Sequence, residues 1–210
     1  MAERFTDALR READALWRAQ LEHPFLQELA AGTLDPARYA FFAAQDTFFL
    51  REYARVLDRA RELAPTAELA RRFAELVAAT ERELELHGDA PAAEPDTATH
   101  AYVEFLHSRP DFAELAAALL PCMWGYSELG RALAERPRPP VEQYAHWIDL
   151  YASDEFAELA SWCREVVDEH VTPENRHRLR AAFLESSRHE LAFWESSYTC
   201  GSSRGVPERG

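Results

Sequence analysis

A thiol and a phenol stand four residues apart in the segment "PCMWGY", which runs from Pro121 to Tyr126. A cysteine thiolate is a strong nucleophile, and a tyrosine one helical turn away can hydrogen-bond beside it. Pro121 lacks an amide hydrogen, so we expect it to kink the helix just before Cys122 and to tilt both side chains inward. The segment therefore predicts that Cys122 and Tyr126 share an interior pocket.

Two carboxylates fall on helix faces that should be buried. At about 100° per residue, aromatic and aliphatic side chains surround Asp46, whereas Arg51 and Arg55 project to the opposite side. Glu190 has the same kind of position in the last predicted helix, among leucine, phenylalanine, tryptophan and serine. A carboxylate in such a place costs several kcal/mol unless it is paired or hydrogen-bonded. Both acids are therefore candidates for a functional site.

Each of these residues also has a purely structural interpretation. A free cysteine often packs as a small hydrophobe, a tyrosine as an amphipathic core residue, and an inward carboxylate as a hydrogen-bonding group between helices. The combination of two inward acids, a thiol and several tyrosines on different helices favours a polar pocket in the core of a bundle.

Composition excludes several classes of protein. The 210 residues suit one domain, and no window approaches the roughly 18 uninterrupted apolar residues of a membrane helix. A net charge of −14 argues against nucleic-acid binding. Three cysteines without a CxxC pair encode neither a disulfide framework nor a thiolate zinc site. The first residues lack a secretory signal pattern, so we expect a cytoplasmic protein.

Apolar residues recur at three- and four-residue spacing throughout, which predicts an all-α, single-domain helical bundle. Gly32 suits a helix C-terminus, and Asp35 followed by Pro36 suits a helix N-terminus. We expect a helical domain over residues 1–198 and a disordered tail over 199–210. The expected helices cover 3–22, a short stretch after the break at 23–25 up to 31, 36–64, 65–87, 97–107, 111 to the proline-rich 136–140, 141–152, 154–170 and, after a cap at 172–174, a last helix to 198.

At this point four segments together resemble the TenA proteins, the thiaminase II or aminopyrimidine aminohydrolase family, which shares a helical fold with haem oxygenase. The segments are "HPFLQELAAGTLDPARYAFFAAQDTFFL" at 23–50, "ALLPCMWGYSELG" at 118–130, "YAHWIDLYASDEF" at 144–156 and "SSRHELAFWESSY" at 186–198. They cover most of the chain in the family's order. The run "LPCMWGY" resembles the branch that carries its catalytic cysteine in this helix.

The resemblance implies a role for each residue already singled out. Asp46 would bind the amino group and ring nitrogen of a pyrimidine, Cys122 would be the nucleophile, and Tyr126 would hydrogen-bond beside it. Glu190 would act as the acid and base. The implied reaction belongs to thiamine salvage: 4-amino-5-aminomethyl-2-methylpyrimidine becomes the 5-hydroxymethyl compound plus ammonia, with thiamine as an alternative substrate.

Three further positions follow from the resemblance. Tyr151 and Tyr102 would line the pocket, and Phe49 stands where the family often has a tyrosine, which leaves the specificity open. The resemblance also implies a homotetramer that needs neither a metal nor a cofactor.

Three alternatives remain at this stage. A haem-binding protein would use His23, although a histidine before a proline is more typical of a helix end. A di-iron oxygenase would draw on Glu81, His87, Glu128 and His189, but the last helix lacks the further ligands that such a site requires. A non-catalytic regulatory protein would leave the two inward acids unexplained.

Overall fold

The computed structural model describes residues 3–86 and 94–200. Within these ranges all regular structure is helical, which confirms the all-α prediction. The helices are α1 (Phe5–Glu12), α2 (Asp14–Leu21), α3 (Pro24–Ala31), α4 (Pro36–Leu63), α5 (Ala67–Leu86), α6 (Thr97–His107), α7 (Phe112–Leu120), the π-helical segment η1 (Pro121–Gly125), α8 (Tyr126–Ala134), α9 (Glu142–Ala152), α10 (Asp154–His170) and α11 (Arg176–Cys200).

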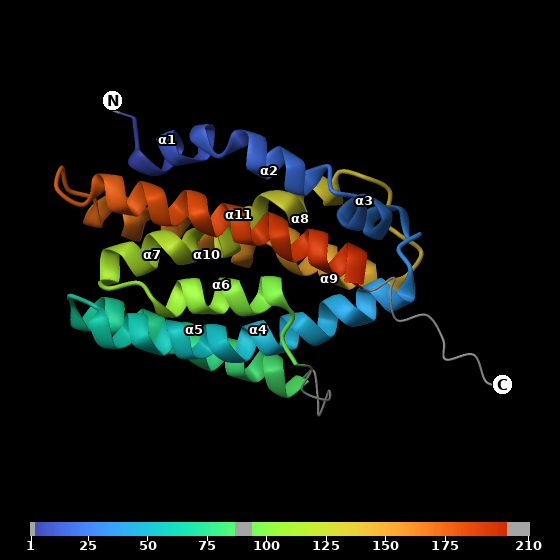
Figure 1. Ribbon diagram of the computed structural model, residues 1–210, viewed down its shortest axis with the longest axis horizontal. Coiled ribbons are helices and arrows are strands. Elements are labelled where there is room, and N and C mark those ends of the chain that lie inside the picture. Colours follow the sequence, from blue (N-terminus) through green and yellow to red (C-terminus); the bar gives the residue numbers. More distant parts are fainter. Residues whose placement is uncertain (1–2, 87–93, 201–210) are drawn as a thin grey trace.

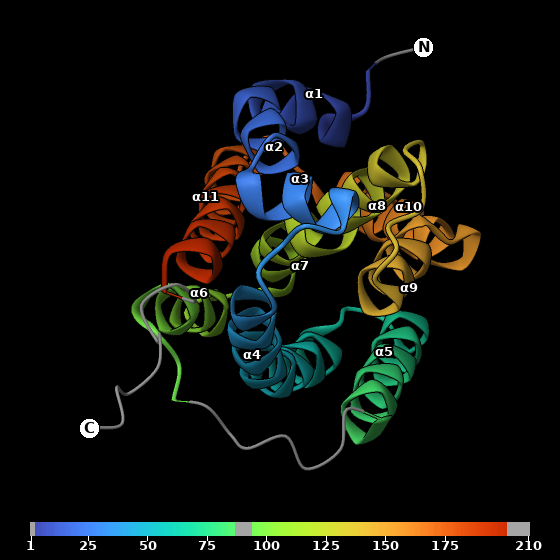
Figure 2. The ribbon, with the colours of Figure 1, turned by 90° about the vertical axis from the view of Figure 1, so that its right-hand side faces the viewer.

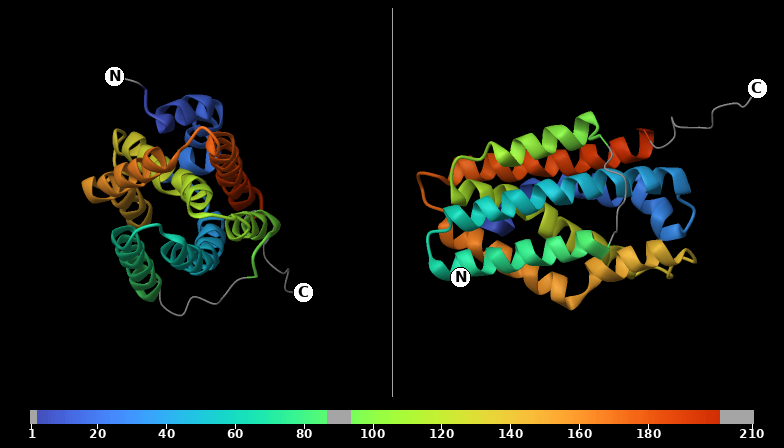
Figure 3. Two further views of the ribbon diagram at one scale, coloured as in Figure 1. Left: turned by 90° about the vertical axis from the view of Figure 1, so that its left-hand side faces the viewer. Right: turned by 90° about the horizontal axis from the view of Figure 1, so that it is seen from below.

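The longer helices lie side by side along the long axis of the molecule (Figure 1). Seen end-on, α11, α6, α4, α5 and the α9–α10 pair surround α7, while α1, α2 and α3 cover one side (Figure 2). Helix α7 packs against α11, α10, α4 and α6, so it is the central element of the bundle. From below, α5 lies between α4 and the α9–α10 pair (Figure 3).

Several helix ends form where the sequence predicted them. The Asp35 side chain accepts a hydrogen bond from the amide of Ala37, and Gly32 ends α3 with a φ of 72°. A side chain at Gly32 would be strained by that φ and would also meet the ring of Pro140 at 2.6 Å. Ser153 caps α10 by accepting from the amide of Phe156.

Three boundaries differ from the prediction. The first predicted helix is interrupted at Ala13, whose amide still donates to the carbonyl of Leu9, so α1 and α2 meet at a local bend. Helix α11 begins only at Arg176, because Thr172 and Asn175 hydrogen-bond each other in a turn before it. It continues to Cys200, two residues beyond the expected end, and the rest of the predicted tail, 201–210, lies outside the described residues.

The expected kink at Pro121 takes the form of a π-helical turn. Helix α7 continues through η1 into α8, and the backbone dihedral angles at both ends of η1 stay in the right-handed helical region. A proline cannot donate the hydrogen bond that an α-helix needs at this position, and π-turns are frequent at functional sites. The wider turn falls on Pro121 to Gly125 and therefore includes Cys122.

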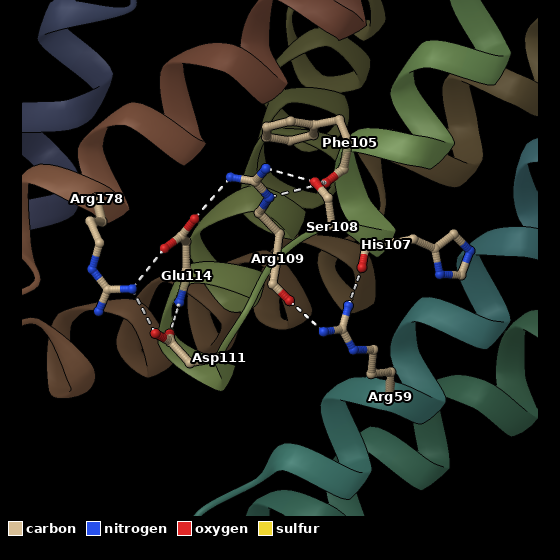
Figure 4. Close-up of polar contacts among 8 residues, drawn as sticks. All are labelled: Arg59, Phe105, His107, Ser108, Arg109, Asp111, Glu114 and Arg178. Carbon is tan, nitrogen blue, oxygen red and sulfur yellow. Dashed lines mark hydrogen bonds and ion pairs between the residues drawn. The ribbon is translucent and has the colours of Figure 1, made fainter.

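A network of arginines ties the loop between α6 and α7 to its neighbours (Figure 4). Glu114 is 7% exposed and accepts hydrogen bonds from Arg109 and Arg178 at 2.9 and 3.0 Å. Arg59 of α4 donates to the carbonyls of His107 and Arg109. The network fixes the end of α6 and the start of α7, the two helices that carry Tyr102 and lead to Cys122.

Candidate active site

A cavity of about 200 Å³ opens among α4, α5, η1, α8, α9 and α10. Five residues expected at the site from sequence lie on its wall: Asp46, Phe49, Cys122, Tyr126 and Tyr151. The rest of the wall is largely apolar and is formed by Leu50, Tyr53, Leu57, Leu76, Ala79, Thr80, Met123, Leu150, Phe156 and Leu159. Since pockets for drug-sized ligands hold roughly 300–1,000 Å³, this space suits a smaller, single-ring molecule.

Helix α4 contributes five of the wall residues, among them Asp46, Phe49 and Tyr53. Asp46 is half-buried, and Phe49 and Tyr53 follow it at helical spacing with 5% exposure each. Arg51 and Arg55 are exposed on the other side. The helical projection therefore predicted correctly that Asp46 belongs to the inward face.

Glu190 and Tyr102 lie behind the cavity wall and form a hydrogen-bonded pair. Glu190 is 2% exposed, and the Tyr102 hydroxyl donates to its Oε1 at 2.6 Å. The same hydroxyl lies 2.9 Å from Oγ of Ser186, which donates to the carbonyl of Ala118 at 2.6 Å. Each hydroxyl has one hydrogen, so a continuous chain of hydrogen bonds from Glu190 to the backbone of α7, one turn before Cys122, forms when Glu190 is protonated and donates to Tyr102.

Burial controls the protonation of the two reactive groups. The pKa of Glu190 is raised from 4.5 to about 7, mainly by burial and also by the charge of Asp46, while Tyr102 and Cys122 act in the opposite direction and lower it. Burial also raises the pKa of the Cys122 thiol well above its usual range, as do the charges of Glu190 and Asp46. Cys122 and Glu190 lie close enough for each to shift the pKa of the other, so a carboxylate that can act as a base stands beside the thiol.

Aromatic rings hold the tyrosines at the other end of the cavity. Tyr126 contacts Tyr151 edge-on at 4.9 Å between ring centroids, and it also packs on Trp194. The backbone of Tyr151 packs directly against Gly130 of α8. A Cβ at this position would lie 2.5 Å from the carbonyl carbon of Tyr151, so the close contact requires glycine. The close approach of α8 and α9 at Gly130 therefore places Tyr151 on the wall.

Sequence reasoning missed three contributors to the site. Ser186 and Tyr53 were recognised only as members of buried faces, and the bonding of Ser186 to Tyr102 and Ala118 has no local signal. The wall formed by α5 was also missed, because an apolar stripe on a helix does not reveal which neighbour it meets.

The residues of the rival interpretations occupy other places. His23 caps α3 by accepting from the amide of Phe25, and its Nε2 lies 3.1 Å from Glu195. Glu128 accepts a hydrogen bond from Arg10 at 2.9 Å. The ring of His189 stacks on that of Tyr102 at 5.2 Å. His87 lies outside the described residues.

Metal-ligating clusters and membrane-spanning helices are both absent from the described ranges. No group of three or more histidine, cysteine, aspartate or glutamate side chains there is placed to hold a metal ion. In the same ranges, no helix is both long and apolar enough to cross a membrane.

Comparison with known proteins gives consistent matches over the length of the chain. The model of the TENA/THI-4/PQQC family matches residues 10–90 and 61–200. An aminopyrimidine aminohydrolase of Halalkalibacterium halodurans is 33% identical, with 92% of this chain and 95% of the relative covered. One from Bacillus subtilis is 31% identical, with 93% and 90% covered.

Solved structures match the fold as well. A TenA homologue from P. horikoshii OT3 has a TM-score of 0.87 and 30% identity, with 95% of this chain and 100% of that chain covered. A domain of unknown function from Shewanella denitrificans with a heme oxygenase-like fold has a TM-score of 0.67 at 13% identity, covering 98% and 97%. The second match concerns the fold alone and confirms the expected haem-oxygenase-like architecture.

Proposed function

The chain belongs to the TENA/THI-4/PQQC family, and we propose that it is an aminopyrimidine aminohydrolase of thiamine salvage. The reaction converts 4-amino-5-aminomethyl-2-methylpyrimidine and water into the 5-hydroxymethyl compound and ammonia. The observation that carries this proposal is the buried carboxyl group of Glu190, with a pKa of about 7, close to Cys122 and beside a cavity of single-ring size whose wall includes Cys122 and Asp46.

The first half of the reaction breaks the aromaticity of the ring. Glu190 in its ionised form accepts the proton of the Cys122 thiol, and the thiolate then adds to a ring carbon of the pyrimidine. Glu190 passes the same proton to a ring nitrogen as the carbon–sulfur bond forms. The aminomethyl group is protonated near neutral pH, so the dearomatised ring supplies the electron pair that expels it as neutral ammonia and leaves an exocyclic methylene.

The second half restores the ring. Water adds to the exocyclic methylene, gives up one proton to Glu190 and forms the hydroxymethyl group. The carbon–sulfur bond then breaks, and the aromatic ring re-forms and releases the proton on its nitrogen to solvent. Cys122 leaves as a thiolate and recovers a proton through Glu190. Because Glu190 accepts and releases protons within one cycle, a pKa near neutrality serves both steps.

The other wall residues bind and orient the substrate. Asp46 accepts hydrogen bonds from the exocyclic amino group and from a protonated ring nitrogen, which sets the ring relative to Cys122. Tyr126 and Tyr151 form the aromatic side of the pocket. Phe49 contributes ring area without a hydroxyl, so its position bears on which pyrimidines are preferred.

Thiamine is the second candidate substrate, because the same adduct can expel its thiazolium ring instead of ammonia. The two substrates differ only in the leaving group, so one set of residues serves both.

The test measures ammonia release from the aminomethylpyrimidine beside cleavage of thiamine, with the wild-type protein and with Cys122→Ser. We expect turnover of the aminomethylpyrimidine that is lost in the variant while the variant still binds substrate. Full activity in Cys122→Ser would overturn covalent catalysis. A folded wild-type protein that turns over neither compound would favour the regulatory interpretation.

We also propose that the protein is a cytoplasmic homotetramer that works without a metal or cofactor. The sequence resemblance supports the assembly, and light scattering during gel filtration tests it: a tetramer has four times the 24.0 kDa mass of the chain. A ferric-haem titration and metal analysis of the purified protein test the two remaining rivals.

A further inference from the structure

Tyr53 has a buried hydroxyl that the mechanism above does not use. Its side chain is 5% exposed, and within the described residues its hydroxyl makes no hydrogen bond of ordinary geometry. A buried polar group without a partner lowers stability and calls for an explanation, and among the buried unpartnered polar atoms of the described residues Tyr53 is the one that also lines the candidate active-site cavity. The hydroxyl therefore calls for a partner that is not in place in the resting protein.

Two thiols flank this tyrosine. Tyr53 and Cys122 both line the candidate active-site cavity, while Tyr53 and Cys163 both line a smaller apolar cavity behind it. Burial raises the pKa of Tyr53, and the charges of Cys122, Cys163 and Glu190 raise it further. Of the two sulfurs, only that of Cys122 lies near enough to the Tyr53 hydroxyl to affect its pKa also as a hydrogen-bonding group, although the contact falls outside ordinary hydrogen-bond geometry.

The chemistry of the two thiols separates them as partners. Cys122 has Glu190 beside it as a base and gives up its proton during the proposed reaction. Burial raises the pKa of Cys163 to about 12, so this thiol stays protonated. A thiolate is a much better hydrogen-bond acceptor than a thiol, because the bond is then charge-assisted.

We propose that the Tyr53 hydroxyl donates a hydrogen bond to the sulfur of Cys122 once the thiol has lost its proton, and that it thereby sets the reactivity of the thiolate. The proton of Cys122 moves to Glu190, the phenolic proton stays on Tyr53, and the new bond stabilises the negative charge on the sulfur. The same bond forms again when the thiolate leaves the ring. This proposal deepens the proposed function and rests on it for its place in the reaction.

The position of the hydroxyl explains a feature of the sequence. Phe49 lies one turn before Tyr53 on the same face, and the two rings stack at 5.7 Å between centroids. Phe49 has no hydroxyl, so on this stretch of the cavity wall Tyr53 is the residue that brings a phenolic donor to Cys122. Tyr126 reaches the cavity from the other side, on α8.

The test follows alkylation of Cys122 by iodoacetamide in the absence of substrate, at pH 8, with the label quantified on the Cys122 peptide by mass spectrometry. Tyr53→Phe should slow this alkylation roughly three- to tenfold, because losing one charge-assisted hydrogen bond lowers the thiolate population by about one pKa unit, partly offset by a more nucleophilic sulfur. In the same variant we expect kcat to fall while KM is retained.

Stability separates this role from a structural one. Tyr53→Phe removes an unpartnered buried hydroxyl, so its melting temperature should equal or exceed that of the wild type. A variant that is merely loosened would melt earlier and would expose Cys122 to faster alkylation. An alkylation rate equal to or above that of the wild type would overturn the proposal.

Two matched variants serve as controls. Tyr144→Phe removes a buried hydroxyl that donates to the Leu34 carbonyl, so it should leave the alkylation rate unchanged. Cys163→Ala should also leave it unchanged, and a fall equal to that in Tyr53→Phe would assign the hydroxyl to Cys163 and overturn the proposal. Because alkylation needs no substrate, it decides the role of Tyr53 even if the pyrimidine is not turned over. An unchanged alkylation rate in Tyr53→Phe would overturn only this proposal, and the Cys122→Ser test would still decide the proposed function.

Discussion

The phenolic oxygen of Tyr102 lies 2.6 Å from Oε1 of Glu190, although the two residues are 88 positions apart in the chain. Tyr102 in turn contacts Ser186, which bonds to the carbonyl of Ala118. With Glu190 ionised, Tyr102 donates to the carboxylate. With Glu190 protonated, Glu190 donates to Tyr102, the Tyr102 hydroxyl donates to Ser186, and Ser186 donates to the carbonyl of Ala118. The buried acid therefore keeps hydrogen-bond partners in both protonation states.

The pH dependence of activity should follow the ionisation of Glu190. Since this carboxylate must be ionised to accept the thiol proton, kcat/KM should rise with pH and level off above about 7. Glu190→Gln should lower kcat roughly 10²- to 10⁴-fold. It should also lose the acidic limb of the pH profile, which is the fall in kcat/KM as the pH drops below about 7. A steady-state pH series decides the point, and a limb that survives in the variant would assign the ionisation to another group.

Tyr102→Phe should move the same acidic limb to higher pH. The hydrogen bond from Tyr102 lowers the pKa of Glu190, so its removal should raise that pKa. Turnover at pH 7 should fall because less of the carboxyl is ionised, and activity should recover as the pH is raised. A limb that stays in place or moves down would show that Tyr102 does not act through Glu190.

Glu190 should also lower the stability of the folded protein above neutral pH. Its pKa rises from 4.5 to about 7 on folding, so the folded state binds the proton more tightly than the unfolded state does. Stability from this group is full below about pH 4.5 and is lost as the pH rises through about 7, by up to about 3 kcal/mol. Urea unfolding at pH 5 and pH 8 measures the loss, and Glu190→Gln should remove this part of the pH dependence.

Two glycines of the cysteine segment should respond differently to the same change. Gly130→Ala would place a Cβ 2.5 Å from the backbone of Tyr151, so we expect a cost of about 1–3 kcal/mol and a raised KM as α9 is displaced. At Gly125 the nearest atom to a new Cβ belongs to Trp17, at 4.0 Å, so Gly125→Ala should be tolerated. Thermal unfolding and KM compare the pair, and equal behaviour would contradict the role given to the close α8–α9 contact.

Asp46→Asn should affect substrate binding more than chemistry. The loss of a charged acceptor should raise KM roughly ten- to a hundredfold, with a smaller change in kcat. The charge of Asp46 raises the pKa of Glu190, so the acidic limb should also move to lower pH. Steady-state kinetics over a pH range gives both values, and an unchanged KM would remove Asp46 from the binding site.

The amino-acid sequence by itself determined the helices, their inward faces and the chemistry of the residues on them. Helical periodicity and capping are local properties, so the sequence alone predicts the inward positions of Asp46, Cys122 and Glu190 and the cap at Asp35. The resemblance of four segments to the TenA proteins indicated the family and implied a role for each of these residues. The bend at Ala13 and the start of α11 were missed, because they depend on packing and on one turn between Thr172 and Asn175.

Only the tertiary structure decided which of these faces meet. The bond between Tyr102 and Glu190, the relay through Ser186 and the wall supplied by α5 join segments far apart in the chain, and such contacts leave no trace in local spacing. The same holds for the raised pKa of Glu190, because burial and the charge of Asp46 act through space. The sequence placed an acid and a thiol on inward faces, and packing around α7 brought Glu190 and Cys122 together beside a cavity.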